Sequence, residues 1–341
     1  MGEAFLLNNG GGLRLRELQV TVQPNKTRYV VIGSIGQNVD LTGAKIVAKL
    51  GQELVTLTPD NYTYVPAGQV TTGVNAIVVS TTLGGITKDC NIPITVVAPD
   101  PVLNNNEWEI ISMVSASGLA STIWSVGDEK QEVVNGVQRT FRIIGFNHDD
   151  LAAQDERVND VEYNAAAYDS GNNIRYAGIT FQYKESAGTG KINSSSTSTG
   201  GWDNCQMRKS TMTTIFEGLP QDMKDVIRTV NIRACVGGSA SANDNLMNVS
   251  EDQLFLLSGA EMIANDSVVA PCENNDLTVY EYYTNHSAKK ANSNEWTRSP
   301  HRPSSCGGSH FVYVNTSGNL YSGDSSSGVT NSMSYYPAFC V

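Results

Sequence analysis

The sequence predicts a two-domain protein, with an N-terminal all-β sandwich followed by a larger α+β domain. Three observations support this. The chain has 341 residues, enough for two sizeable cores. Short strand-like runs recur at even spacing up to residue 97. The charge balance also changes near residue 100: residues 1–100 hold 7 Lys/Arg and 7 Asp/Glu, whereas residues 101–341 hold 16 and 27 and carry the whole net charge of −11.

The N-terminal domain is predicted to span residues 13–98, after an attachment segment at 1–12. Runs rich in β-branched residues alternate with clusters of Pro, Asn, Asp and Gly, which favour turns. Short strands separated in this way are typical of a β-sandwich. The predicted strands are Leu13–Val22, Arg28–Ile32, Ala44–Leu50, Leu54–Thr58, Asn75–Ser80 and Ile92–Val97.

Residues 99–106 are predicted to form a linker. They contain two prolines, Pro99 and Pro101, and an Asn run at 104–106. Prolines stiffen a connection, and Asn favours turns, so this composition marks a domain boundary. The C-terminal domain then covers residues 107–341.

The first part of the C-terminal domain mixes predicted helices and strands. Asn106 and Glu109 match a capping box, which begins a helix that Gly118 ends. A second helical region covers 206–217. A third begins at Pro220, because Met223, Val226, Ile227 and Val230 follow helical spacing. The predicted strands are Ile123–Val126, Arg139–Phe146, Gly178–Tyr183 and the buried run Leu254–Leu257.

Composition excludes several classes of partner. An acidic domain without basic clusters is repelled by DNA, RNA and anionic lipid. No window approaches 18 apolar residues, so no membrane span is expected. The first ten residues lack the basic region and apolar run of a signal peptide, which predicts synthesis in the cytosol; if the protein works outside cells, lysis or another route must release it.

The six cysteines include no C-x-x-C pair, which argues against a zinc site and a dense disulfide framework. Most are predicted to be buried thiols. A Cys306–Cys340 bridge and a Cys205–Cys235 bridge remain open alternatives.

The segment 304–336 has the composition of a binding surface. Of its 33 residues, 26 are Ser, Gly, Tyr, Asn, Thr, Asp or His, with Asp324 the only acid and no Lys or Arg. Tyr supplies rigid contact area while Ser, Gly and Asn supply adaptable hydrogen bonds, as in antibody paratopes. A polar surface loop or a disordered tail is the alternative. The apolar runs 311–314 and 338–341 argue against disorder, because they predict buried strands.

Ordered motifs in both domains resemble known families. Leu57–Tyr64 followed by Gly73–Ser80 resembles bacterial immunoglobulin-like domains, which act as spacers or docking modules. A second series resembles an uncharacterised domain family of Firmicutes exported proteins and their phages, over residues 107–341. Its motifs are Trp124–Asp128, Ile143–Asp149, Gly201-Trp202, Met207-Arg208, Leu219-Pro220, Val226-Ile227, Glu251–Ser258 with Glu261, Trp296–Pro300 and Pro337–Cys340.

The C-terminal part also resembles the C-type-lectin-like fold in its formylglycine-generating-enzyme variant. This resemblance implies a receptor-binding scaffold of the kind found in phage adhesins diversified by retroelements. Such diversification favours Asn, Ser, Asp, Tyr, His, Thr and Gly at exposed sites. Trp296, Arg298 and Phe339 are interpreted as buried framework residues.

Catalytic and metal chemistry are poorly supported. His148 beside Asp149 and Asp150 is interpreted as a turn or cap, because a metal site needs several convergent ligands. Trp202–Cys205 resembles the calcium motif of sugar-binding lectins, but its order differs and no Glu-Pro-Asn partner is present. No combination of residues meets the requirements of an active site, and no cofactor or metal is predicted.

The sequence therefore predicts a tail-associated adhesin of a phage virion that binds a host-surface glycan or protein. The N-terminal module would contact other tail proteins, and a homotrimer is compatible with this role. A binding module of the bacterial cell surface is the runner-up, and an enzyme of the formylglycine-generating type ranks third. The predicted ligand-binding residues are His301, Arg302, Ser304, Ser305, His310, Tyr313, Asn315, Asn319, Tyr321, Asp324, Ser325, Ser326, Asn331, Ser332 and Tyr335.

Overall fold

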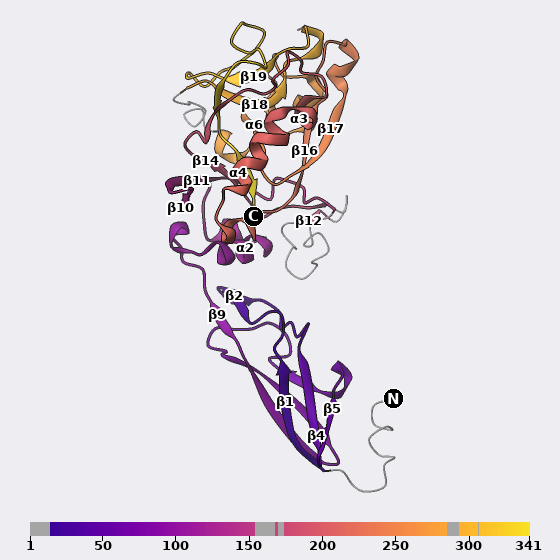
Figure 1. Ribbon diagram of the computed structural model, residues 1–341. Helices are drawn as coiled ribbons and strands as arrows, with labels where there is room; N and C mark the ends of the chain where they lie inside the picture. Colours follow the sequence, from indigo (N-terminus) through magenta and orange to yellow (C-terminus); the bar gives the residue numbers. More distant parts are fainter. Residues whose placement is uncertain (1–13, 154–167, 170–173, 285–292, 306) are drawn as a thin grey trace. The chain divides into compact units, whose positions relative to one another are not determined.

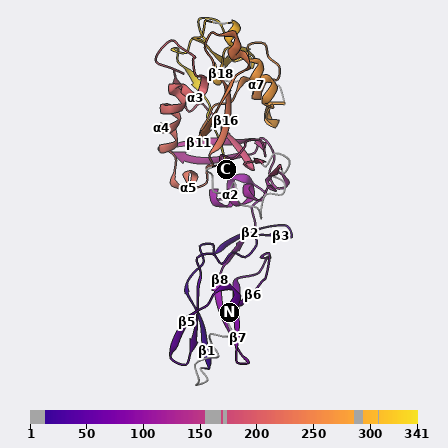
Figure 2. The same ribbon diagram turned by 90° about the vertical axis from the view of Figure 1, so that its right-hand side faces the viewer.

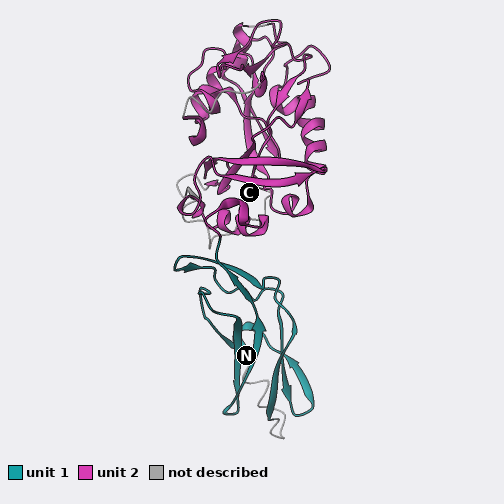
Figure 3. Ribbon diagram, turned by 90° about the vertical axis from the view of Figure 1, so that its left-hand side faces the viewer, with its two compact units in different colours: residues 1–99 teal, residues 100–341 magenta. Residues whose placement is uncertain are grey.

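The structure, a computed structural model, describes residues 14–153, 168–169, 174–284, 293–305 and 307–341. The chain separates into two compact units, 1–99 and 100–341, which are coloured separately in Figure 3. The boundary falls within the predicted linker. Both units are rich in β-strands, arranged in several sheets, and the helices of the second unit are short. The predicted attachment segment at 1–12 and Cys306 lie outside the described residues.

Unit 1 consists of three small sheets around one apolar core. Their strand orders are β1-β4-β5, β3-β2-β9 and β6-β7-β8. The core is made of residues such as Tyr29, Ile77 and Ile92, each fully buried. The strands are β1 (Leu15–Val22), β2 (Arg28–Ile32), β3 (Ile35–Gly36), β4 (Lys45–Leu50), β5 (Glu53–Thr56), β6 (Thr63–Val65), β7 (Ala76–Leu83), β8 (Ile86–Pro93) and β9 (Thr95–Val97), and Pro59–Asn61 forms a 3₁₀ turn.

Five of the six predicted strands of unit 1 begin and end within a few residues of observed strands. The sixth, Ile92–Val97, is wrong in part, because it covers the end of β8 and the whole of β9. β7 and β8 form one long hairpin in which Leu83 pairs with Ile86, so Gly84 and Gly85 form a two-residue turn. Both glycines have positive φ, which that turn requires. Most of β8 was not predicted, because its middle residues are polar and largely exposed.

Unit 2 contains a four-stranded sheet, β10-β11-β14-β22, and a five-stranded sheet, β15-β21-β18-β19-β20, with two smaller strand pairs (Figure 1). Its strands are β10 (Glu129–Val134), β11 (Val137–Phe146), β12 (Tyr168–Asp169), β13 (Ile174–Arg175), β14 (Ile179–Tyr183), β15 (Gly188–Gly190), β16 (Val230–Cys235), β17 (Met247–Asp252), β18 (Glu295–Pro300), β19 (Phe311–Val314), β20 (Leu320–Tyr321), β21 (Met333–Tyr335) and β22 (Ala338–Cys340). Its helices are α2 (Trp108–Ala116), α3 (Gly201–Asn204), a π-helix (Met207–Met212), α4 (Thr213–Glu217), α5 (Gln221–Lys224), α6 (Gly259–Met262) and α7 (Pro271–Asp276), with 3₁₀ turns at Leu103–Asn105, Ala120–Thr122, Ser241–Asn245 (η6), Glu281–Thr284 and Pro303–Ser305.

The start of the first helix differs from the prediction. Helix α2 begins at Trp108, and its N-cap residue Glu107 makes no side-chain cap bond. The amide group of Asn106 instead donates to the backbone oxygens of Asp100 and Val102, each at 3.0 Å. Asn106 therefore fixes the chain before the helix. The predicted end at Gly118 agrees, since its φ of +68° suits a helix C-terminus.

The predicted strand Ile123–Val126 is wrong. The chain there leaves a 3₁₀ turn, and the backbone N–H of Trp124 donates to the oxygen of Ala120. The apolar pattern was genuine, since the Trp124 side chain is 2 % exposed and its indole N–H donates to Asp100. The apolar pattern therefore marks a turn that the buried Trp124 anchors, and not a strand.

Two other predicted elements are buried as expected but have a different backbone. The helix beginning at Pro220 is only the short α5, and Val230 starts strand β16 by pairing with Asp252. The run Leu254–Leu257 is buried but makes a single bridge, between Phe255 and Ala338. Apolar spacing found the core positions here, but did not determine the backbone conformation.

The open alternative of a Cys205–Cys235 bridge is wrong, because both residues are free thiols. Cys340 is a free thiol too, and its suggested partner Cys306 lies outside the described residues. Burial of the three thiols agrees with the more general prediction. Among the described residues, no helix is both long and apolar enough to cross a membrane.

Candidate functional site

The predicted binding stretch is carried by the five-stranded sheet of unit 2. Its central strand β18 is buried along its whole length, and so is its neighbour β19. The run 311–314 was predicted to be a buried strand, which is confirmed. The expectation that Tyr313 contacts ligand requires exposure, and that exposure is wrong, because its side chain is only 5 % exposed. The strands thus provide a rigid base, and the loops between them reach the surface.

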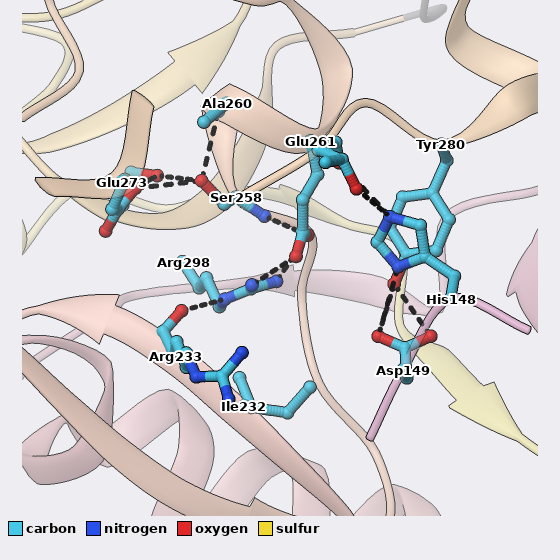
Figure 4. Close-up of polar contacts among 12 residues, drawn as sticks. His148, Asp149, Ile232, Arg233, Ser258, Ala260, Glu261, Glu273, Tyr280 and Arg298 are labelled. Atoms are coloured by element: carbon cyan, nitrogen blue, oxygen red, sulfur yellow. Dashed lines mark hydrogen bonds and ion pairs between the residues drawn. The ribbon is translucent and has the colours of Figure 1, made fainter. Parts of the chain in front are cut away.

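The side chain of Arg298 anchors β18 to α6 and to the backbone of a neighbouring segment. Its guanidinium forms a bidentate ion pair with Glu261 of α6 (Figure 4). It also donates to the backbone oxygen of Leu256 at 2.9 Å. Both charged side chains are almost fully buried. The prediction that Arg298 is a buried framework residue is confirmed. Because such a pair is costly to break, it fixes the position of the sheet.

The two other framework predictions are also confirmed. Trp296 is 2 % exposed, and its indole N–H donates to Gly190 at 2.9 Å, which ties β18 to β15. Phe339 is fully buried and stacks on Phe181 with a centroid distance of 5.5 Å. Both aromatic side chains hold strands together and neither reaches the surface.

An open groove of about 570 Å³ lies over the edge of this sheet. Among the described residues, none that lines it carries a charge. Four predicted site residues meet there, and five lining residues were not predicted. The lining residues are Thr189, Ser293, Asn294, Ser325, Ser326, Asn331, Ser332, Met333 and Ser334.

Two side chains shape the loop that forms one wall of the groove. Asp324 accepts hydrogen bonds from the backbone N–H groups of Ser326 and Ser327, at 3.0 and 2.9 Å. Asn331 closes the loop from the other side by donating to the oxygens of Ser325 and Ser326. Although burial would raise the pKa of Asp324, these N–H donors hold it below its usual value. The carboxylate and the amide are therefore supports of the wall.

A stacked pair of tyrosines lies next to this wall. The rings of Tyr313 and Tyr321 are 6.0 Å apart at 27°, and the hydroxyl of Tyr313 donates to Asp324 at 3.0 Å. Tyr313 is only 5 % exposed, whereas Tyr321 is 46 % exposed. Tyr313 is thus a support for its neighbour, and Tyr321 presents the free ring face.

Tyr335 is also a packing residue. Its ring covers β15, where a Cβ atom added at Gly188 would lie 2.4 Å from the Tyr335 hydroxyl oxygen. A Cβ at Gly190 would meet the same ring at 3.2 Å. The glycines of β15 therefore make room for Tyr335, which is half-buried.

A second group of predicted residues gathers around Asp244 of η6. Its carboxylate accepts from the guanidinium of Arg302 at 3.0 Å and from both the backbone and hydroxyl of Ser304. Burial acts to raise the pKa of Asp244, but these donors lower it below its usual value. His301 lies beneath, 7 % exposed, and its burial lowers the pKa of the imidazole. Asp244 had no distinguishing signal in the sequence.

The other predicted residues are spread over neighbouring turns. Asn315 accepts from the backbone N–H groups of Ser317 and Asn319 at 3.0 Å, so it shapes a turn. Of the fifteen predicted residues, two are buried: His301 and Tyr313. Five are half-buried: Arg302, His310, Asn315, Asn331 and Tyr335. Eight are exposed: Ser304, Ser305, Asn319, Tyr321, Asp324, Ser325, Ser326 and Ser332.

His148 and Asp149 belong to a separate polar network in the interior. The imidazole stacks on Tyr280 with centroids 3.7 Å apart, and the Tyr280 hydroxyl donates to both oxygens of Asp149 (Figure 4). Burial alone would raise the pKa of Asp149, but His148, Thr180 and Tyr280 lower it to about 2. The same carboxylate, in turn, raises the pKa of His148 against the opposing effect of burial. His148 was interpreted as a turn or cap residue, and this network with Tyr280 and Asp149 was not predicted.

The lectin-like calcium motif has no counterpart in the geometry. Trp202 is fully buried and donates to Asp252 at 2.8 Å, and Asp203 pairs with Arg208 at 3.3 Å. Asp252 also accepts from Arg208 at 2.6 Å, so both acids bind the same guanidinium. Across the described residues, no three His, Cys, Asp or Glu side chains converge as metal ligands.

Comparison with known families locates the site within a shared region. No curated protein matches the chain. Residues 178–341 are similar to a family described as a domain of unknown function, DUF6273. This stretch contains the five-stranded sheet and every residue of the groove, and it excludes unit 1.

Proposed function

We propose that this protein is a receptor-binding adhesin of a phage tail and that the open groove over β21 is its principal contact surface. The observation that carries the proposal is the meeting of Ser325, Ser326, Asn331 and Ser332 in one uncharged groove. Hydroxyl and amide groups there can donate and accept hydrogen bonds in many arrangements, as in paratopes. A host-surface glycan or protein is the expected ligand.

The support beneath the groove favours binding. Loops that recognise ligands work best on rigid scaffolds, because less conformational entropy is lost on association. Here Asp324 and Asn331 fix the wall, and the exposed ring of Tyr321 lies beside it on Tyr313. Aromatic residues of this kind concentrate binding energy in interfaces.

The finer description of the fold is part of the same proposal. Unit 1 is proposed to be an immunoglobulin-like spacer that attaches to other tail proteins, which its three small sheets and single core support. Unit 2 is proposed to be a C-type-lectin-like domain, diversified by a retroelement. Its loop-bearing sheet and the Ser/Asn/Tyr composition of 304–336 support this.

Blocking the groove tests the proposal. Ser326→Trp and Ser332→Trp place a bulky ring on exposed positions of the groove, and host-cell binding is expected to fall at least tenfold, about 1.4 kcal/mol. Ser121→Trp is the matched control, since Ser121 is also an exposed serine of unit 2 but lies outside the groove. Equal host binding by all three folded variants and the parent would rule out this surface.

A second experiment separates the proposed location from a bacterial surface. Antibodies against unit 2 should label the tails of purified virions in electron microscopy. Labelling of uninfected bacterial cells, with none on virions, would favour the cell-surface alternative.

A further inference from the structure

Two cysteines that sequence analysis did not pair lie together in unit 2. Cys235 ends strand β16 and is fully buried, and Cys272 lies in the first turn of α7 with 8 % exposure. Figure 2 shows β16 and α7 in the upper part of this unit. Both thiols are unpaired, and they pack with Ala270 in a small cluster of their own.

The surrounding backbone holds the two sulfur atoms in place. The N–H of Cys235 donates to Glu273 of α7 at 2.7 Å, which anchors the end of the strand to the helix. The Cys235 thiol donates to the oxygen of Asn243 at 3.3 Å, and the Cys272 thiol donates to the oxygen of Leu246 at 3.6 Å. Both thiols thus face the same connection, η6 and the residue after it.

The two thiols differ in pKa. When Cys272 is deprotonated, the Cys235 thiol can donate its single proton to the Cys272 sulfur in place of the Asn243 oxygen; this hydrogen bond lowers the pKa of Cys272, and the backbone N–H groups of Cys272 and Glu273 act in the same direction. The same shared hydrogen bond, together with burial, raises the pKa of Cys235. The thiolate is the reactive form of cysteine. Cys272 is also the more exposed member, at 8 % against 0 % for Cys235, so it is the sulfur that an oxidant can reach and it takes the role of nucleophile.

We infer that Cys235 and Cys272 form an oxidisable dithiol site, which a peroxide converts into a disulfide that staples β16 to α7. The Cys272 thiolate attacks one oxygen of hydrogen peroxide, the O–O bond breaks, and Cys272 becomes a sulfenic acid while hydroxide leaves. Cys235 then attacks that sulfur, and its proton leaves with the hydroxyl group as water. In total, two thiols and one peroxide give one disulfide and two waters.

The staple has a specific structural consequence. Asn243 and Leu246, which the two thiols contact, flank Asp244 in the chain. Asp244 holds Arg302 and Ser304 at the surface. Oxidation removes both S–H donors, so a disulfide between Cys235 and Cys272 would release the oxygens of Asn243 and Leu246. This would loosen η6 and, through Asp244, the surface loop at 302–304. This inference does not depend on the identity of any receptor.

Peptide mapping of the full-length protein tests the site. The reduced protein, treated with hydrogen peroxide and digested under non-reducing conditions, should yield a peptide pair joined through Cys235 and Cys272. The melting temperature should rise by roughly 10 °C, because the staple closes a long loop. Oxidised glutathione should react more slowly, since the buried sulfur admits only a small oxidant.

Two variants separate the roles of the sulfurs. In Cys235→Ser, a sulfenic acid should accumulate at Cys272 and be trapped by dimedone, whereas Cys272→Ser should leave Cys235 unmodified. The matched control is Cys205→Ser, which removes another buried thiol whose pKa burial raises to about 12 and should leave the crosslink intact. The inference would be overturned if oxidised wild-type protein gave no peptide pair joined through Cys235 and Cys272, or if another pair of cysteines were crosslinked to the same extent.

Discussion

Tyr313 and Tyr321 stack across β19 and β20, but only one of the two rings is available to a ligand. The inner ring of Tyr313 is 5 % exposed and bonded to Asp324, while the outer ring of Tyr321 is 46 % exposed. One tyrosine thus serves the fold and the other serves the surface. Adjacent residues of the same type have separable roles.

The first prediction separates these roles. Tyr321→Ala should weaken host-cell binding by about 2 kcal/mol, close to thirtyfold, with little change in the melting temperature. Tyr313→Ala should instead lower the melting temperature, because it removes a buried ring. The double variant Tyr321→Ala with Tyr335→Ala should disturb the fold as well as binding, since Tyr335 packs on the glycines of β15. Unaltered binding by folded Tyr321→Ala would remove this ring from the contact surface.

The second prediction concerns the buried framework. Trp296→Ala and Phe339→Ala should each lower the free energy of unfolding of unit 2 by roughly 3–5 kcal/mol, since both side chains are buried aromatics. Urea denaturation followed by tryptophan fluorescence for Phe339→Ala, and by circular dichroism for both, measures the effect. Val249→Ala is a control, because Val249 is 56 % exposed. Parent-like denaturation midpoints in the two aromatic variants would contradict the structure.

The third prediction concerns Glu295, which is buried at the start of β18. Burial raises the pKa of its carboxyl from 4.5 to about 8, against an opposing effect of Arg142. Because the folded-state pKa is the higher one, stability is fully present below 4.5 and is lost as the pH rises towards 8. The loss reaches about 3 kcal/mol near pH 7.

Glu295→Gln removes this titration. The variant should be more stable than the parent at about pH 8 and close to it at about pH 4.5, in thermal denaturation at both values. A constant difference between the two proteins across this range would show that Glu295 does not titrate as described. The comparison cancels the other titrating groups, which both proteins share.

The fourth prediction concerns independent folding of unit 1. A fragment spanning residues 13–98 should show a cooperative thermal transition by circular dichroism, because it contains the complete core of this unit. A shorter fragment ending at residue 94 lacks β9, which pairs in parallel with β2. It should melt at a lower temperature. If the longer fragment shows no transition, the domain boundary lies elsewhere.

The sequence predicted the positions of burial better than it predicted backbone conformation. Leu254–Leu257 and Trp124 are buried as expected, but a bridge and a turn stand where strands were predicted. Apolar periodicity reports only that a side chain faces the core. Whether the backbone forms a ladder depends on partners far along the chain, such as Ala338 for Phe255.

The candidate site shows the same division. Composition located the surface loop, and Ser325, Ser326, Asn331 and Ser332 do meet in one groove. Thr189 and Ser293 also line the groove, but they are distant in sequence and nothing in their residue types marks them as site residues. Likewise, the partner of Cys235 could not be found by spacing, because Cys272 reaches it only through the packing of α7 on β16. Such pairings become visible only in three dimensions.

In the loop that forms one wall of the groove, the residues that hold its shape differ from the residues that can be varied. Asp324 and Asn331 hold this loop through backbone atoms of Ser325, Ser326 and Ser327, so the hydroxyl groups of Ser325 and Ser326 are not what keeps its shape. Replacement of those two serines can change what the groove recognises at little cost to stability. This loop is therefore suited to library selection, in which Ser325 and Ser326 are varied to obtain new specificities while Asp324 and Asn331 stay constant.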